Sequence, residues 1–178
     1  SVGTPILACR VKIDNPDENG EGEICVKGPN VMLGYYNNPE ATAEVFDKDG
    51  FFHTGDYGML DEEGWIYITG RKKNLIILSN GENVSPEELE NKFAGKDMVA
   101  EVLIYAEEGY ITAEIVPNPE YFKDKEKTEI AAELTELIKE INKTLPMYKY
   151  IKGLSVTETP LIKTTTNKIK RNEEIKTV

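Results

Sequence analysis

The sequence contains few of the residues that form metal centres, disulfides and proton-transfer sites. It has two cysteines and one histidine in 178 residues. Cys9 and Cys25 lie in apolar surroundings at a spacing that matches no metal site, so we expect reduced core thiols and no disulfide. His53 has no evident partner in the sequence, which favours a structural hydrogen-bonding role. No Ser-His-Asp set, metal-ligand cluster or glycine-rich phosphate loop is recognisable, and we expect no metal site in this chain.

Long apolar runs are also missing. No stretch is long enough to span a bilayer, so we expect no transmembrane segment. The first residues, 1–5, have neither the basic start nor the apolar core of a signal peptide. They also lack an initiator Met, which indicates a fragment or a processed chain.

Positive charge is in the minority. Lys and Arg number 21 against 32 Asp and Glu, a net charge of -11. Such a chain repels polyanions, so we expect no nucleic-acid partner, although a local basic site for one small anion is compatible with this charge. Hydrophobic residues make up 39% and charged residues 30%, a composition typical of one globular domain or two small ones.

The first part of the chain has the pattern of short β-strands separated by glycine turns. Strands are predicted at residues 22–28, 51–53 and 65–68, turns at 47–50 and 61–64, and a short helix at 39–46. Several short strands of this kind indicate a small barrel or a distorted sheet.

The pattern changes after Gly70 to a mixture of helices and strands. Ser85 followed by Pro86 is a strong helix start. A β-hairpin is predicted around the turn Glu107, Glu108, Gly109, and a last strand at residues 151–156. One apolar stripe predicts a longer helix and consists of Ile130, Leu134, Leu137, Ile141 and Leu145. This part is therefore predicted to be a compact α+β unit with two main helices, beginning near residues 71–74.

Three short segments carry candidate chemistry. Residues 163–171 hold four cations and three threonines, which suit contact with phosphate or carboxylate but also suit a solvated basic tail. Asp56, after Thr54 and Gly55, could accept hydrogen bonds from the vicinal hydroxyls of a ribose or could cap a turn through its own backbone. The cations of residues 71–73 could pair with phosphate or could form the charged edge of a linker.

The order of these motifs resembles one family. Residues 28–35 (GPNVMLGY), 54–56 (TGD), 70–73 (GRKK), 81–86 (GENVSP) and 168–171 (KIKR) follow one another as in the C-terminal part of AMP-forming acyl-CoA synthetases. These belong to the adenylate-forming superfamily, with luciferases and nonribosomal adenylation domains. The resemblance covers nearly the whole chain and is greatest to the long-chain fatty acid branch. Two positions depart from the family pattern: Asn167 stands where Gly is usual, and Asn83 where Arg is frequent.

The resemblance implies a role for each motif. It implies that Lys168 is the catalytic lysine of adenylation, that Thr54, Asp56 and Arg71 contact the nucleotide, and that Lys73 is the hinge of a mobile lid. A further implication is that the turn of Gly81, Glu82 and Asn83 faces CoA. The implied fold is α+β: a small β-barrel-like subdomain at residues 1–71, belonging to a larger N-terminal domain, followed by a compact lid domain at residues 72–178.

The implied function is that of a long-chain fatty acid–CoA ligase using fatty acid, ATP and CoA, with Mg²⁺ bound by ligands outside this chain. Because the phosphate loop and acyl tunnel of the family precede the matching segment, we expect the chain alone to be inactive without the missing N-terminal domain. Two alternatives remain: a carboxylate-adenylating enzyme that loads a carrier protein, and a non-catalytic lid-like binding module. The expected location is the cytoplasm, and the alternative is that the full-length protein associates peripherally with membranes.

Overall fold

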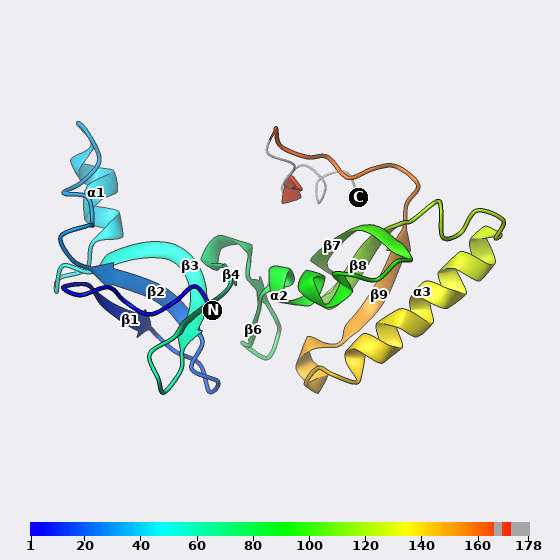
Figure 1. Ribbon diagram of the computed structural model, residues 1–178, viewed down its shortest axis with the longest axis horizontal. Helices are drawn as coiled ribbons and strands as arrows, with labels where there is room; N and C mark the ends of the chain where they lie inside the picture. Colours follow the sequence, from blue (N-terminus) through cyan, green and yellow to red (C-terminus); the bar gives the residue numbers. More distant parts are fainter. Residues whose placement is uncertain (166–168, 172–178) are drawn as a thin grey trace. The chain divides into compact units, whose positions relative to one another are not determined.

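Residues 1–165 and 169–171 are described by the computed structural model (Figure 1). The chain divides into two units, Ser1–Leu75 and Ile76–Val178. The division falls shortly after the boundary expected between residues 71 and 72. The assignment of residues 1–71 and 72–178 to two functional domains stays a prediction.

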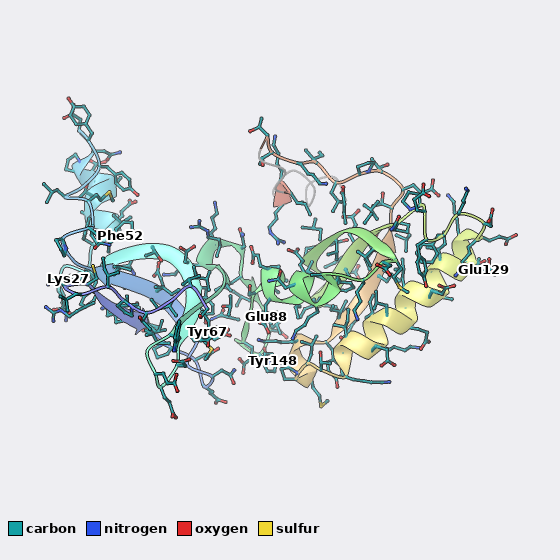
Figure 2. The ribbon with its side chains drawn as sticks, in the orientation of Figure 1. Lys27, Phe52, Tyr67, Glu88, Glu129 and Tyr148 are labelled. Carbon is teal, nitrogen blue, oxygen red and sulfur yellow. The ribbon has the colours of Figure 1, made fainter. Side chains whose placement is uncertain are left out.

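The first unit is built on one antiparallel sheet. Its strands pair in the order β1-β2-β3-β4 and are β1 (Arg10–Asp14), β2 (Gly22–Lys27), β3 (Phe52–Leu60) and β4 (Ile66–Arg71). Of the two sequence expectations, barrel or distorted sheet, the chain forms the sheet. In the part of the chain that is described, the sheet does not close into a barrel, because β4 is not paired with β1. Figure 2 labels Phe52 at the start of β3 and Tyr67 in β4.

Aspartates form the two predicted turns of the first unit. Asp47 Oδ1 accepts from the backbone amides of Asp49 (2.9 Å) and Phe51 (2.8 Å), and Asp61 Oδ1 accepts from Glu63 (3.0 Å) and Trp65 (2.8 Å). These side chains replace backbone partners within the turn. The helix predicted at residues 39–46 is present as α1 (Pro39–Val45), and the side chain of Asn38 caps its start.

The second unit places one long helix on a mixed sheet (Figure 1). Strands β7 (Val99–Glu107) and β8 (Tyr110–Pro117) form the predicted hairpin, and β9 (Ile151–Val156) pairs with β8 in parallel after the crossover helix α3 (Lys127–Asn142). The smaller elements are β5 (Ile76–Ile77), β6 (Asn83–Val84), the short helix α2 (Pro86–Glu90) and the 3₁₀ segments Asn91–Phe93 and Met147–Lys149. None of the helices described is long and apolar enough to cross a membrane.

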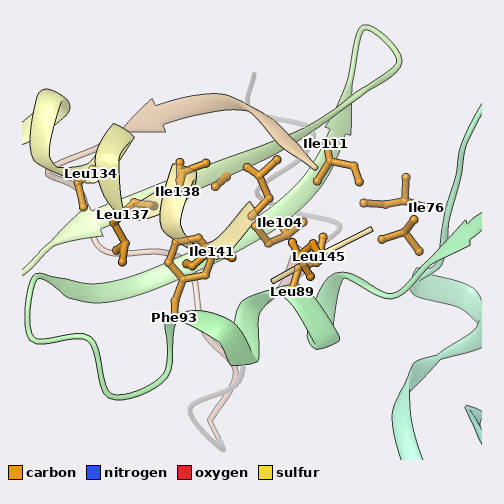
Figure 3. Close-up of a cluster of buried hydrophobic side chains, with 14 of the residues drawn as sticks. Ile76, Leu89, Phe93, Ile104, Ile111, Leu134, Leu137, Ile138, Ile141 and Leu145 are labelled. Carbon is orange, nitrogen blue, oxygen red and sulfur yellow. The ribbon is translucent and has the colours of Figure 1, made fainter. Parts of the chain in front are cut away.

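The core of the second unit confirms the predicted helix stripe except at Leu145, which is buried but lies beyond the end of α3. Leu134, Leu137 and Ile141 are buried on α3, together with Ile138 (Figure 3). They pack with Leu89 and Phe93 of the α2 region and with the sheet residues Ile104 and Ile111. Near this core the buried Lys149 donates to Glu88 of α2 at 2.7 Å. Figure 2 labels Glu88 and Tyr148, the residue before Lys149.

Candidate nucleotide site and hinge

Strand β3 contains a bulge at residues 54–56, where the resemblance places nucleotide contacts. In the pairing of β2 with β3, Glu23 lies opposite Tyr57 and Cys25 lies opposite His53. Residues 54–56 of β3 therefore lie opposite a single residue of β2, Ile24. Gly55 has φ +72°, a conformation that favours glycine. A bulge bends its strand and re-aims a side chain, here that of Asp56. The end predicted for the strand at residues 51–53 is therefore wrong, because β3 continues through Asp56 to Leu60.

The hydroxyl of Thr54 holds the bulge together. It donates to the carbonyl of Ile24 at 2.7 Å and accepts from the amide of Asp56 at 3.0 Å. Both bonds are to backbone groups, so the hydroxyl shapes the turn that presents Asp56. A nucleotide contact by Thr54 stays a prediction.

Asp56 and Arg71 form a cross-strand pair. They lie opposite each other in β3 and β4, and Arg71 Nη1 is 2.9 Å from Asp56 Oδ1. The side chains are 27% exposed for Asp56 and 55% for Arg71, and a pair this open adds about 0–1 kcal/mol of stability. The site thus presents a carboxylate acceptor beside a guanidinium donor, the chemistry that a ribose and a phosphate require together.

Lys72 and Lys73 follow this pair directly. They form a 3₁₀ turn, Lys72–Asn74, after β4, and both side chains are exposed. The turn ends at Leu75, the last residue of the first unit. The candidate hinge Lys73 thus lies two residues before the sequence boundary between the two units.

The candidate CoA-facing turn belongs to the second unit. The amide of Gly81 donates to the carbonyl of Leu78 at 2.9 Å, and Gly81 has φ +86°. The amide of Leu78 donates to the carbonyl of Glu82 at 2.9 Å, and Asn83 begins β6. The predicted turn is confirmed, and its role toward CoA stays a prediction.

Lys168 lies outside the described residues, but the described chain on both sides of it is anchored. Lys163 and Ile169 form an isolated antiparallel bridge, and Lys163 Nζ donates to Glu101 Oε1 at 2.5 Å. Arg171 donates to the carboxylate of Glu90 and, at 3.2 Å, to the carbonyl of Ile104. Burial raises the pKa of the Glu90 carboxyl, and the Arg171 guanidinium opposes that rise. The sequence analysis grouped Arg171 with the other cations of residues 163–171 and missed this partly buried pair.

A polar cluster around the buried Glu23 was also missed. Glu23 Oε2 lies 2.8 Å from His53 Nδ1 and 2.7 Å from Lys72 Nζ, and Cys25 Sγ lies 3.4 Å from the same His53 nitrogen. His53 thus has the structural role expected of it. The cluster borders an open cavity of about 480 Å³ lined by Glu23, Tyr35, Glu44, Val45, Phe46, Phe52, His53, Thr54, Gly55 and Lys72.

Glu23, Cys25 and His53 are the types of residue that bind metals, but this group does not fit Mg²⁺. Mg²⁺ prefers oxygen ligands, and the one carboxylate is already paired with the ammonium of Lys72. Burial raises the pKa of the Cys25 thiol to about 11, which opposes thiolate ligation of softer metals. Among the residues described, Cys9 and Cys25 are both free thiols; Cys25 is buried, whereas Cys9 is only partly buried.

Comparisons with known proteins identify the family of the chain. The family model of the AMP-binding enzyme C-terminal domain matches residues 73–177. Long-chain-fatty-acid–CoA ligase 5 of Rattus norvegicus is 40% identical over 127 residues, covering 67% of this chain and 19% of the ligase. Long chain acyl-CoA synthetase 1 of Arabidopsis thaliana is 36% identical over 207 residues, covering 99% of this chain and 31% of the synthetase.

A solved structure shares the fold of nearly the whole chain. O-succinylbenzoate coenzyme A synthetase from Bacillus subtilis, in complex with ATP and magnesium ion, is similar with a TM-score of 0.73 and 36% identity, over 96% of this chain and 34% of that one. The chain therefore spans about a third or less of the length of these proteins. The curated relatives are long-chain acyl-CoA ligases, and by the family model this chain belongs to the family of AMP-binding enzyme C-terminal domains.

Proposed function

We propose that this chain serves, within a longer polypeptide, as the ribose-contacting end and the mobile lid of a long-chain fatty acid–CoA ligase. The observation that supports this most is the pairing of Asp56 with Arg71 at 2.9 Å, directly before the candidate hinge Lys73. Two side chains that the family uses on one nucleotide are neighbours here, although they are distant in sequence. The similarity to long-chain-fatty-acid–CoA ligases and a long chain acyl-CoA synthetase supports a long-chain fatty acid as the substrate class and CoA as the acceptor.

The proposed reaction has two steps. A carboxylate oxygen of the fatty acid attacks the α-phosphorus of ATP, forming acyl-AMP and releasing pyrophosphate; the sulfur of CoA then attacks the acyl carbon and AMP leaves. Asp56 accepts hydrogen bonds from the ribose hydroxyls, and Arg71 donates to ribose or phosphate oxygens. Mg²⁺ would offset the charge of the triphosphate, with ligands from outside this chain. The ammonium of Lys168 would offset the repulsion between the carboxylate and the α-phosphate as they meet.

The lid would turn between the two steps. Lys73 is the proposed pivot, because it is exposed and stands just before the end of the first unit. After the turn, the loop of Gly81, Glu82 and Asn83 would face the pantetheine of CoA. Lys168 would then leave the nucleotide, so it is required for the first step alone.

The experiment uses the full-length enzyme and measures the half-reactions separately. Lys168→Ala should abolish acyl-AMP formation and spare thioester formation from supplied acyl-AMP. Lys73→Pro should do the opposite, because proline restricts the backbone rotation of the hinge. Lys123→Ala, which removes an exposed lysine of the second unit, is the control and should change neither step. Equal loss of both half-reactions in Lys168→Ala would count against the catalytic role, and unchanged thioester formation in Lys73→Pro would refute the hinge.

The acceptor and the state of the isolated chain are tested alongside. We propose free CoA as the acceptor; faster loading of a carrier-protein thiol by the full-length enzyme would favour the alternative enzyme class. The chain alone should form no acyl-AMP, and binding without chemistry in the full-length protein would favour a lid-like module. We also propose a cytoplasmic location, which cell fractionation tests against peripheral association with membranes.

A further inference from the structure

Glu23 of β2 connects two segments that the proposed function uses separately. Its carboxylate is buried, with 7% of the side chain exposed. Oε1 accepts from the backbone amide of Gly55 at 3.2 Å, within the bulge that presents Asp56. Oε2 accepts from Lys72 Nζ at 2.7 Å, and Lys72 is the residue between Arg71 and the hinge Lys73. One carboxylate is therefore bonded both to the nucleotide-site bulge and to the start of the hinge.

The charges around Glu23 keep it ionised. Burial raises the pKa of its carboxyl, but hydrogen bonds from Lys72 and His53 outweigh burial, and the net pKa is lowered. The bond with Glu23 raises the pKa of Lys72 in turn. Because an ionised carboxylate only accepts hydrogen bonds, His53 Nδ1 must carry the proton of the 2.8 Å contact. The third donor thus steadies the carboxylate between its other two partners.

The bonds of Glu23 differ in how easily they open. Gly55 and His53 bind it from within the sheet, through β3. Lys72 reaches it from a side chain that is 59% exposed, so water can replace this partner when the hinge segment moves. The bulge is therefore held continuously, whereas the hinge segment is held by a bond that can break and form again.

We propose that Glu23 is a positioning residue, which sets the 54–56 bulge for the nucleotide and, through Lys72, holds the hinge segment in register with that bulge. This inference rests on the proposed function and adds to it a link between nucleotide binding and lid movement. Glu23 need not touch any substrate in this role.

The test compares three variants in the full-length ligase. In Lys72→Met the ratio of the two half-reaction rates should change by about fivefold or more, the size of a typical coupling between sites, while the KM for ATP stays within about twofold. Lys72→Arg restores a cation and should return the ratio to that of the wild type. In Glu23→Gln, a neutral amide group replaces the carboxylate that faces the donors on His53 and Lys72. The KM for ATP should rise about tenfold, the effect expected for the loss of one charged hydrogen bond. The ratio of the half-reaction rates should shift as in Lys72→Met.

Lys12→Met is the matched control. Lys12 pairs with Asp47 at 2.6 Å in the same unit, and none of its contacts in the described part of the chain reaches residues 54–56 or 71–73, so both readouts should stay at the wild-type level. A Glu23→Gln enzyme with wild-type KM and ratio, or a Lys72→Met enzyme that matches Lys12→Met, would overturn the proposal. If Glu23→Gln fails to fold, the exposed Lys72 variants still decide the hinge link. A wild-type enzyme that forms no acyl-AMP would instead overturn the proposed function itself.

Discussion

Leu134→Ala should destabilise the second unit strongly and leave the first unit unchanged. Leu134 has no exposed surface and lies in the core between α3 and the sheet (Figure 3). Removal of three buried carbons costs about 2.4 kcal/mol at about 0.8 kcal/mol each, and the cavity left behind brings the total to about 3–4 kcal/mol. For a unit of roughly 100 residues this corresponds to a fall in Tm of about 12 °C or more.

Two signals separate the units in the assay. Trp65 is the single tryptophan and belongs to the first unit, so its fluorescence reports on that unit. Helical circular dichroism reports mainly on α3, which has 16 residues against seven in α1 and five in α2. Leu134→Ala should lower the midpoint of the dichroism transition and leave the Trp65 transition in place.

The matched control is Glu136→Ala on the same helix. Its side chain is 68% exposed and pairs only with Lys139 among the contacts described, so its loss should cost less than about 0.5 kcal/mol. A Leu134→Ala effect as small as that of Glu136→Ala would refute the burial argument. Equal shifts of both signals would show that the two units unfold as one.

Two further predictions concern the first unit and use Trp65 fluorescence during denaturation. Gly58→Ala should cost about 1–3 kcal/mol, because its Cβ would stand 2.0 Å from the carbonyl oxygen of Tyr67; a change within about 0.5 kcal/mol would contradict the register of β3 with β4. The hydrogen bond from Lys12 lowers the pKa of Asp47 from 3.8 to about 2, so Asp47 contributes stability above about pH 4 that is lost as the pH falls toward 2. Asp47→Asn should therefore be less stable than the wild type near neutral pH and approach it in acid, and a difference that stays constant with pH would refute this.

The elements with local signals were predictable from the sequence. Asp47 and Asp61 form turns because their side chains bond amides two and four residues ahead, which depends on a few neighbouring residues only. The hairpin around Glu108 and Gly109 and the stripe of α3 follow from short-range periodicity in the same way.

The candidate site was predictable only in part, because its geometry depends on which strands pair. The extent of β3 was missed because the bulge at Gly55 interrupts the alternation that marks a strand. The partners of His53 and Arg171 were missed for a related reason: Glu23 lies 30 residues from His53, and Glu90 lies 81 residues from Arg171. No local pattern links residues so far apart, whereas the resemblance could propose Asp56 and Arg71 as site residues through their motifs.

The parallel pairing of β8 with β9 has a consequence for the order of folding. Ile111 is in register with Ile151, so β9 can complete the sheet only after the whole of α3 has been synthesised. Until then the β7–β8 hairpin exposes an open edge and apolar residues such as Ala113 and Ile115, which are fully buried in the finished unit. Open apolar edges of this kind favour association between chains. A polypeptide that stops before Ile151 should therefore aggregate, although it retains most of the sheet.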